Sequence, residues 1–346
     1  LTDALNWAKQ KYKIEKESSD FLDQIYGESK PALSARDVIF SFPRDAFWGG
    51  YFRLGTLGGG NHFLEAQTVD RLIDKPAAER LGLSEGQIIF MFHTGSGVLS
   101  KRLDNYYGIR YENNIWYKDL RKRLRKYSFH LGDLRLWRFN KRSSFFFSGK
   151  FKGIPADSLE AKRFMVALQA SLNYSFANRA IISDFIREAL GNTIKKDFSI
   201  SFLSDTIHER IDYEQFQGNN FWVHRNGAVK VCYRNADMEI LPIPGFMGGP
   251  SFLCLPEKGV IDSRYSVNHG AGRVFDKEEA KNKFSSQDIF GALEQKGIRL
   301  FKLGKEDIRE QAPAAFKDIY KVLESLKSNR LVAPIASTSP LAILKG

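Results

Sequence analysis

Six histidines in this sequence carry imidazoles that could bind a metal ion or attack a phosphate. An imidazole nitrogen binds many divalent transition ions, and the neutral ring is also a nucleophile. Singly, such a histidine is more often structural, and no HExxH or CxxC pattern is present to show that several of them converge. Together, His62, His93 and His208 could supply nitrogens to one ion. The six histidines are His62, His93, His130, His208, His224 and His269.

Three glycine-rich segments stand beside histidine, asparagine or arginine: GTLGGGNH, PGFMGGP and HGAGR. Glycine lets backbone amides approach a ligand closely, and successive amides in such turns bind anions, so phosphate is the expected guest. The alternative is that each is simply a tight turn. HGAGR favours a nucleotide site most, because it combines the imidazole of His269, backbone amides and the charge of Arg273.

The elements that must position these residues alternate irregularly between helix and strand. A short strand carrying His62 and Glu65 is predicted after the first glycine run, and an apolar strand ends at His93. Without a βαβ period or internal repeat, we expect an α+β fold with mixed, largely antiparallel sheets and surrounding helices. Helices are predicted over 157–191, 286–296 and 314–327.

Composition is that of an ordinary globular protein, with 346 residues, 43% hydrophobic and 27% charged. No apolar run approaches the roughly 18 residues needed to span a bilayer, and the first residues do not resemble a signal peptide, so we expect no membrane association and a cytoplasmic protein. Cys232 and Cys254 are too few for a disulfide framework; we expect small core residues in a reducing compartment.

Positive charge is concentrated between residues 101 and 153, a basic, aromatic-rich insert. This insert holds fifteen Lys or Arg against four Asp or Glu, so it accounts for +11 of the chain's formal charge of +12. Cations interleaved with aromatic rings are typical of surfaces that neutralise phosphates and stack unpaired bases, which favours RNA. The alternative is a solvated basic hairpin with its aromatics packed beneath. His130 falls within the insert, where we expect it to be exposed.

Several motifs, taken in order, resemble those of the RtcB RNA ligase family. The resemblance covers about Leu54 to Gly346, with the insert as a variable segment, and implies the RtcB-like fold in a single catalytic domain over residues 1–346. GGGNHF and HGAGR followed by a terminal LKG are specific to the family in combination. The motifs are GTLGGGNHFLE, HTGSG, IHERIDYE, IPGFMG, NHGAGRV, AFKDIYKVL and LAILKG.

The resemblance implies a GTP- and manganese-dependent enzyme that joins RNA ends in tRNA splicing or RNA repair. His269 matches the histidine that takes up GMP from GTP, after which GMP activates an RNA 3′-phosphate, or a 2′,3′-cyclic phosphate once opened, for attack by a 5′-hydroxyl. His62, His93 and His208 match histidine ligands to manganese, of which the family binds two ions. The implied partner is RNA, as tRNA halves or broken strands. We expect a monomer, with an accessory activating protein as a further partner.

The resemblance also implies a set of residues that hold guanine and phosphate. His224 matches a position near the site, and we expect it to be structural rather than a ligand. The expected nucleotide-binding residues are Asn61, Glu65, Gly245, Met247, Gly248, Gly270, Ala271, Gly272, Arg273 and Lys345.

Some family features are missing or altered. The DVGCG motif, whose aspartate and cysteine complete the two-manganese site, is not in this sequence, and the chain starts at Leu1; we expect either truncation or a separate chain that supplies it. Gly97 stands for the usual arginine, Phe246 for serine, and Glu209 for asparagine. Two alternatives to ligation therefore stay open: a catalytically decayed RNA-binding relative and a metal-dependent phosphodiesterase.

Overall fold

The chain divides into two compact units, each described by itself. The first comprises Leu1–Thr56 and Gly95–Glu188, and the second Leu57–Thr94 and Ala189–Gly346. No helix of the described residues is long and apolar enough to cross a membrane. The computed structural model describes residues 41–42, 44–107, 156, 158–194, 197–231, 239–304 and 307–346. Most of the insert over 101–153, with His130, lies outside these ranges, as does Cys232.

The described helices of the first unit are α4 (Arg44–Tyr51), α6 (Val98–Tyr107) and α9 (Leu159–Thr193), of which the residues after Glu188 are assigned to the second unit. The helix predicted over 157–191 is thus confirmed as α9, which begins after Ser158, whose hydroxyl accepts from the amide of Ala161. The helices pack through a cluster of buried apolar side chains. That cluster comprises Phe42, Ala46, Leu99, Leu103, Tyr107, Ala167, Ala170 and Tyr174.

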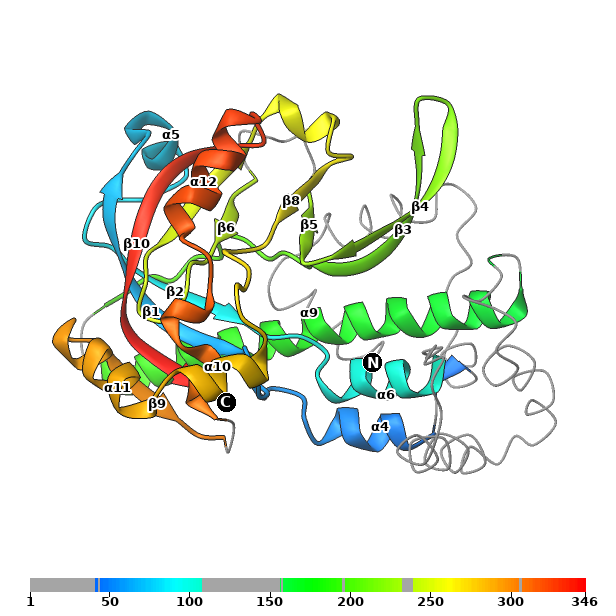
Figure 1. Ribbon diagram of the computed structural model, residues 1–346, viewed down its shortest axis with the longest axis horizontal. Coiled ribbons are helices and arrows are strands. Elements are labelled where there is room, and N and C mark those ends of the chain that lie inside the picture. The colour runs from blue at the N-terminus through cyan, green and yellow to red at the C-terminus, as the bar shows by residue number, and fades with distance from the viewer. Residues whose placement is uncertain are drawn as a thin grey trace. The chain divides into compact units, whose positions relative to one another are not determined.

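A six-stranded sheet forms the centre of the second unit (Figure 1). Its strands pair antiparallel, except that β9 runs parallel to the end of β10, so the expected α+β class with antiparallel strands is confirmed. The apolar terminal segment of the chain is the end of the long central strand β10. In sheet order the strands are β2 (Ile88–His93), β1 (Phe63–Leu72), β10 (Val332–Lys345), β7 (Ser251–Pro256) and β6 (Leu241–Ile243), with β9 (Arg299–Lys302) beside β10.

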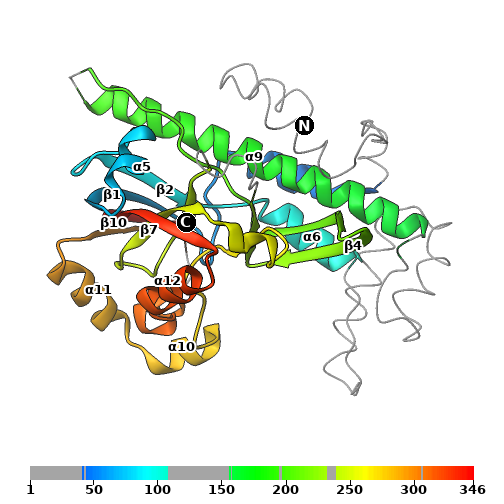
Figure 2. The same ribbon diagram turned by 90° about the horizontal axis from the view of Figure 1, so that it is seen from above.

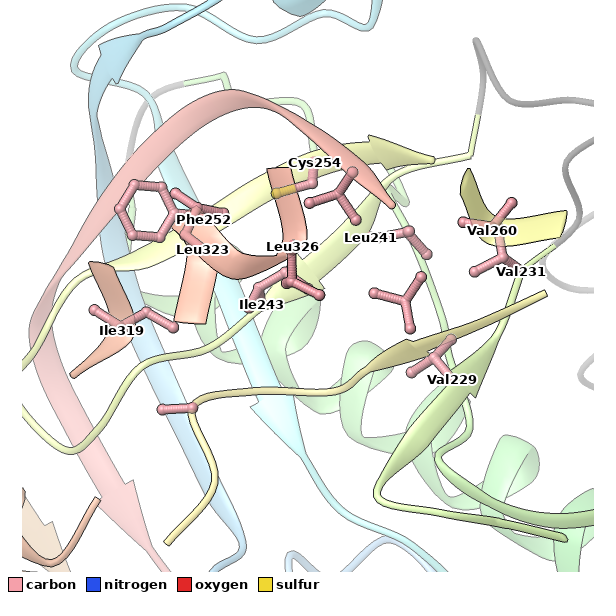
Figure 3. Close-up of a cluster of buried hydrophobic side chains, with 13 residues drawn as sticks. Val229, Val231, Leu241, Ile243, Phe252, Cys254, Val260, Ile319, Leu323 and Leu326 are labelled. Atoms are coloured by element: carbon pink, nitrogen blue, oxygen red, sulfur yellow. The ribbon is translucent and has the colours of Figure 1, made fainter. Parts of the chain in front are cut away.

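Both faces of this sheet are covered, which explains why β7 is buried throughout. Because successive side chains point to opposite faces, Phe252 and Cys254 enter one core, while Leu253 and Leu255 enter another. The first core packs against α12 (Ile319–Ser328), through Ile319, Leu323 and Leu326 (Figure 3). The second packs against α5 (Lys75–Arg80), through Ala77 and Ala78. Cys254 is therefore the small core residue that the sequence predicts.

The remaining helices of the second unit lie with α12 on one side of β10 (Figure 2). Helix α11 (Ser286–Gln295) confirms the helix predicted over 286–296. The helix predicted over 314–327 starts later than expected, because Asp318 caps α12 and short 3-10 turns precede it. The elements not yet named are α10 (Lys277–Lys283) and the 3-10 turns η4 (Lys258–Ile261), η5 (Ile308–Gln311) and η6 (Pro313–Ala315).

Two two-stranded sheets complete the second unit, and each adjoins a histidine in the sequence. Strands β3 (Glu209–Phe216) and β4 (Asn219–Asn226) form a hairpin whose two-residue loop, Gln217 and Gly218, has positive φ at both positions, as a tight hairpin turn requires. Strand β5 (Ala228–Lys230) pairs antiparallel with β8 (Ser266–Asn268).

Candidate active site built on four histidines

Four histidine rings, distant in sequence, lie close together in the second unit; we call His62, His93, His208 and His269 the histidine cluster. His62 precedes β1 and His93 ends β2, and the register that pairs Phe63 with His93 brings these two together. Their ring centroids are 5.5 Å apart. His93 lies 5.0 Å from His208 and 5.9 Å from His269. The rings of His208 and His269 are stacked, at 3.9 Å.

One backbone residue, Gly227, contacts two members of the cluster. Its carbonyl oxygen lies 2.9 Å from Nδ1 of His269 and also accepts from the His269 amide, at 3.2 Å. Its own amide donates to the carbonyl of His208 at 2.8 Å. Because a carbonyl can only accept, Nδ1 of His269 carries the hydrogen in this contact, which leaves the lone pair of the neutral ring on Nε2. Nε2 is therefore the ring nitrogen that carries the lone pair in this tautomer.

The surroundings of His93 favour the neutral form of its ring. Burial, together with the nearby rings of His208, His62 and His269 and the ammonium of Lys345, lowers the pKa of His93 to about 2. The His93 ring therefore keeps a free lone pair at neutral pH, which is the form that binds a metal ion.

A buried polar group lies on β1 and β10 beyond the cluster. Glu65 accepts from Nε2 of Gln67 at 2.6 Å, and Gln67 in turn accepts from the hydroxyl of Thr338 at 2.6 Å. Burial raises the pKa of Glu65 to about 7, against the opposing effects of the Gln67 hydrogen bond and the charge of Lys345. Lys345 is itself only 7% exposed and lies opposite Phe63 in the sheet. The predicted guanine residues Glu65 and Lys345 are thus electrostatic neighbours.

The glycine loop before β1 packs closely against both His62 and Gly346. At Gly58, where φ is +81°, an added Cβ would lie 2.7 Å from Nδ1 of His62. At Gly346 an added Cβ would lie 2.0 Å from the carbonyl oxygen of Gly58. Close packing therefore requires glycine at both positions. Asn61, in the same loop, is exposed.

The other two glycine segments lie against each other. The amide of Ala271 donates to the carbonyl of Pro244 at 3.1 Å, and an added Cβ at Gly270 would lie 3.0 Å from that same oxygen. Gly245 is equally confined, since a Cβ there would lie 2.2 Å from the carbonyl oxygen of Pro250. The two loops form one packed unit.

Of the predicted nucleotide residues in these loops, some face the protein interior. Met247 and Ala271 are buried in separate apolar cores. Gly248 has a φ of +76°, and an added Cβ would lie 2.4 Å from the side chain of Leu293. Gly272 is exposed, and its carbonyl accepts from the amide of Lys317. Any ligand contact from Met247 or Ala271 would therefore come from the backbone.

Arg273 directs its guanidinium toward the backbone. Nε donates to the carbonyl of Phe275 at 2.9 Å and Nη2 to that of Glu310 at 2.8 Å, while the group lies over the ring of Phe316. Burial lowers its pKa, partly offset by the charges of Glu310 and Asp276. These contacts hold the guanidinium against the segment around η5 and η6.

The cluster offers imidazole nitrogens, a donor type that suits divalent transition ions. Imidazoles that bind one ion at about 2.1 Å place their ring centroids about 5 Å apart. The His62–His93 and His93–His208 separations, 5.5 and 5.0 Å, match this value. Among the residues that the structure describes, no three His, Cys, Asp or Glu side chains form a group poised to hold an ion. Coordination thus requires the nitrogens to turn toward a common point.

Comparison with known proteins decides the family. The family profile described as "tRNA-splicing ligase RtcB" matches residues 14–346. The chain belongs to the RtcB family. The tRNA-splicing ligase RtcB of Methanopyrus kandleri is 31% identical over 318 residues, which cover 85% of this chain and 30% of that protein. Those of Methanococcus maripaludis and Pyrococcus horikoshii are 30% and 28% identical, over 85% of this chain and 60% and 33% of theirs.

This RtcB-family chain therefore spans from about a third to three fifths of the length of these relatives. The family residue changes fall in different surroundings. Phe246 is half-buried, and its ring is so close to Gly249 that a Cβ there would lie 2.6 Å away. Glu209 is exposed at the start of β3. Gly97 belongs to the first unit, where it is exposed with a φ of +46°.

Sequence reasoning did not identify Gly227 as a contact of the histidine cluster. Its signal is the Asn226-Gly227 pair, typical of a turn that needs positive φ, and φ at Gly227 is +75°. His224, three residues before Gly227, is exposed on β4 opposite Ile211. It is not one of the ring contacts of the histidine cluster.

Proposed function

We propose that this chain is an RNA ligase that joins an RNA 3′-phosphate, or a 2′,3′-cyclic phosphate after opening, to a 5′-hydroxyl through a GMP-charged His269. The observation that supports this most is the Gly227 contact of His269. It leaves the lone pair of the neutral His269 ring on Nε2, within the histidine cluster. Membership of the RtcB family supplies the reaction class.

The chemistry proceeds in three displacements at phosphorus. Nε2 of His269 attacks the α-phosphate of GTP; the N–P bond forms as the bond to pyrophosphate breaks. An oxygen of the RNA 3′-phosphate then displaces the imidazole and takes up GMP. Finally the RNA 5′-hydroxyl attacks the 3′-phosphate, its proton passes to water, and GMP leaves. Covalent catalysis of this kind divides one difficult transfer into easier steps.

The residues that would hold manganese are His62, His93 and His208. When bound, the ion would neutralise triphosphate charge and orient the leaving group. The pKa of His93, lowered to about 2 by burial and by the neighbouring rings, keeps that side chain in the form a metal ion requires. The stacking of His269 on His208 keeps the proposed nucleophile beside the ion-binding rings without making it one of the ligands.

The nucleotide would be held by groups of three kinds. Glu65 and Lys345, coupled within the sheet, would pair with the edge of guanine. Asn61, exposed at the glycine loop, would contact phosphate. The packed loops over Gly245–Gly248 and Gly270–Arg273 would contribute backbone groups beside His269, and the described contacts of Arg273 would have to change for it to reach a phosphate.

RNA is the proposed partner, and the basic aromatic insert over 101–153 is its proposed contact surface. The insert's local charge of +11 favours a polyanion. An accessory activating protein and action as a single copy are parts of the same proposal.

An RNA-joining assay tests this function. The protein, expressed from its complete reading frame, is incubated with manganese, GTP and two RNA strands that end in a 3′-phosphate and a 5′-hydroxyl. We expect a joined strand that requires GTP and disappears in the His269→Gln variant. RNA cleavage without GTP that is indifferent to Lys345→Met would instead indicate a phosphodiesterase. RNA binding without joining would indicate a noncatalytic relative. Either result would refute the proposal.

A further inference from the structure

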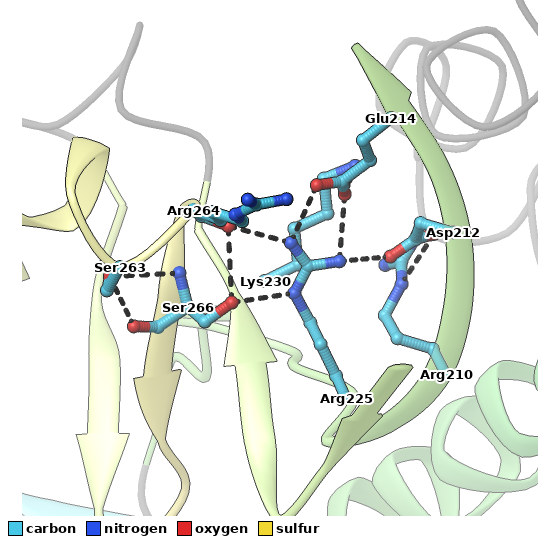
Figure 4. Close-up of polar contacts among 8 residues, drawn as sticks. All are labelled: Arg210, Asp212, Glu214, Arg225, Lys230, Ser263, Arg264 and Ser266. Atoms are coloured by element: carbon cyan, nitrogen blue, oxygen red, sulfur yellow. Dashed lines mark hydrogen bonds and ion pairs between the residues drawn. The ribbon is translucent and has the colours of Figure 1, made fainter. Parts of the chain in front are cut away.

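A buried ion-pair network lies on one face of the β3–β4 hairpin, centred on Arg225 (Figure 4). The Arg225 side chain is only 1% exposed. Its Nη1 lies 2.5 Å from Asp212 and 2.8 Å from Glu214, and its Nη2 donates to the other oxygen of Glu214 at 3.0 Å. Arg210 and Lys230 also pair with these two carboxylates.

Each carboxylate of this network is paired with positive charges. Although burial alone would raise it, the hydrogen bonds from Arg225 and Lys230 hold the pKa of Glu214 below its usual range. Asp212 is completely buried and forms ion pairs with both Arg210 and Arg225. A buried arrangement of this kind seldom raises stability over an apolar core, but it defines geometry, because each charge must keep its partners.

The same guanidinium reaches a second ribbon. Nε of Arg225 donates to the hydroxyl of Ser266 at 3.0 Å, and Nη2 donates to the carbonyl of Arg264 at 2.8 Å. Ser266 begins β8, which leads directly into His269. Arg225 thus ties the end of β4 to the start of β8.

The two segments that Arg225 joins also carry the two partners of one hydrogen bond, that between Gly227 and His269. Arg225 is two residues before Gly227, and Ser266 is three residues before His269, so the guanidinium joins the two segments that carry the acceptor and the donor of the Gly227–His269 bond. We propose that Arg225 is a positioning residue that holds His269 in the tautomer with its lone pair on Nε2. The catalytic part of this inference rests on the proposed function; the tautomer itself does not.

Only arginine among the cationic side chains can make all of these contacts. Its planar group offers five donors in a fixed geometry, whereas lysine has one ammonium without that fork. Arg225→Lys keeps the positive charge that pairs with Asp212 and Glu214. Its ammonium cannot also donate to the hydroxyl of Ser266 and the carbonyl of Arg264. This substitution therefore removes the bridge to β8 while it leaves a positive charge in the ion-pair network.

Nitrogen NMR of the histidine rings tests the inference without any activity. The protein is labelled with ¹⁵N-histidine, and the His269 signals are assigned by their loss in His269→Gln. We expect one tautomer, protonated on Nδ1, in the unsubstituted protein and in Lys230→Met, which removes an ion pair of the network but not the bridge. In Arg225→Lys we expect a mixture of tautomers. An unchanged single tautomer in folded Arg225→Lys would overturn the proposal.

A milder substitution covers the case in which Arg225→Lys does not fold. Ser266→Ala removes only the bridging hydroxyl, whereas Ser328→Ala removes an exposed hydroxyl on α12 that donates to the carbonyl of Ser325. We expect tautomer mixing in Ser266→Ala and none in Ser328→Ala. Equal behaviour of the two alanine variants would count against the bridge.

Kinetics then tests the consequence for catalysis. Because misplacing a reacting group by about 1 Å costs about a hundredfold, we expect Arg225→Lys to lower the rate of GMP transfer to His269 by roughly 10-fold to 100-fold, with KM for GTP unchanged. A parallel loss in both constants, matched by a loss of folded protein in melting curves, would indicate a merely structural role. If the unsubstituted protein took up no GMP, the proposed function would fail, while the NMR result would still decide the tautomer.

Discussion

The Nδ1 atom of His269 lies 2.9 Å from the carbonyl oxygen of Gly227, and this contact determines which ring nitrogen is free to react. The amide of the same glycine donates to the carbonyl of His208, so the proposed nucleophile and a proposed metal ligand share one backbone anchor. A change in the β4–β5 connection is therefore transmitted to both.

Gly58 should be intolerant of any side chain because of its contact with His62. In Gly58→Ala the new Cβ would lie 2.7 Å from Nδ1 of His62. We expect manganese affinity to fall about 10-fold to 100-fold, as when the support of a metal ligand is removed. Gly60→Ala is the matched control, since it has the same positive φ but its nearest neighbour is the end of Lys277, at 3.7 Å. Titration of both variants with Mn²⁺, followed by EPR, makes the comparison; equal affinities would contradict it.

Glu65 should make stability depend on pH. Its pKa is raised by burial from 4.5 to about 7, so the folded state holds a proton that the unfolded state releases between these values. The unfolding free energy therefore falls as pH rises through this window, by on the order of 3 kcal/mol in total. Glu65→Gln lacks this loss, so it should gain stability relative to the unsubstituted protein between pH 5 and pH 8.

Urea unfolding of the metal-free protein at the two pH values measures this gain. Glu209→Gln is the control, because that carboxylate is exposed on β3. A constant difference between Glu65→Gln and the unsubstituted protein across the range would show that the carboxyl is not held protonated.

Lys345 should contribute more to GTP binding than Lys302, its neighbour in the sheet. Its charge lowers the pKa of Glu65, so Lys345→Met should raise that pKa further and remove a charged donor from the proposed guanine site. We expect KM for GTP to rise at least about tenfold, the usual effect of losing a hydrogen bond to a charged group. Lys302, which lies opposite Lys345 on β9 and is exposed, provides the control substitution Lys302→Met. Similar KM values in the two variants would refute the role.

The basic insert should carry the salt-sensitive part of RNA binding. Charge reversal at Arg121, Lys122, Arg123 and Arg125, which lie outside the described residues, should weaken RNA binding and flatten its dependence on salt. Fluorescence anisotropy at several salt concentrations measures both. The control reverses four exposed cations of the second unit, and binding that is equally affected in the two variants would exclude a specific role for the insert. These control positions are Lys75, Arg80, Lys258 and Lys327.

Local sequence patterns were sufficient to predict the fold class and to single out the histidines as candidate site residues. A continuous apolar run ending at His93 is a strand, and the i+4 spacing of apolar residues after 157 is helix α9. Glycine-rich turns beside His62 and His269 indicated where backbone could approach a ligand. Pairing of β1 with both β2 and β10 then brought such residues together, through register that periodicity does not specify.

The ion-pair network could not be predicted in the same way. In ERIDYEQF, alternating charges are typical of a solvated strand face, yet Arg210 and Asp212 are buried, and Asp212 pairs with both Arg210 and Arg225. The contacts of Arg273 were equally hidden, since its partners come from the backbone near Glu310. Burial of a charged side chain depends on distant partners, and short-range patterns do not contain them.

The most direct test of the account is covalent labelling of His269. The protein, expressed from its complete reading frame, is incubated with manganese and GTP labelled at the α-phosphate, and the labelled peptide is identified by mass spectrometry. We predict an acid-labile guanylate on the peptide that contains His269, absent from His269→Gln and retained in His224→Gln. Absence of label from the unsubstituted protein, or its persistence in His269→Gln, would contradict the account.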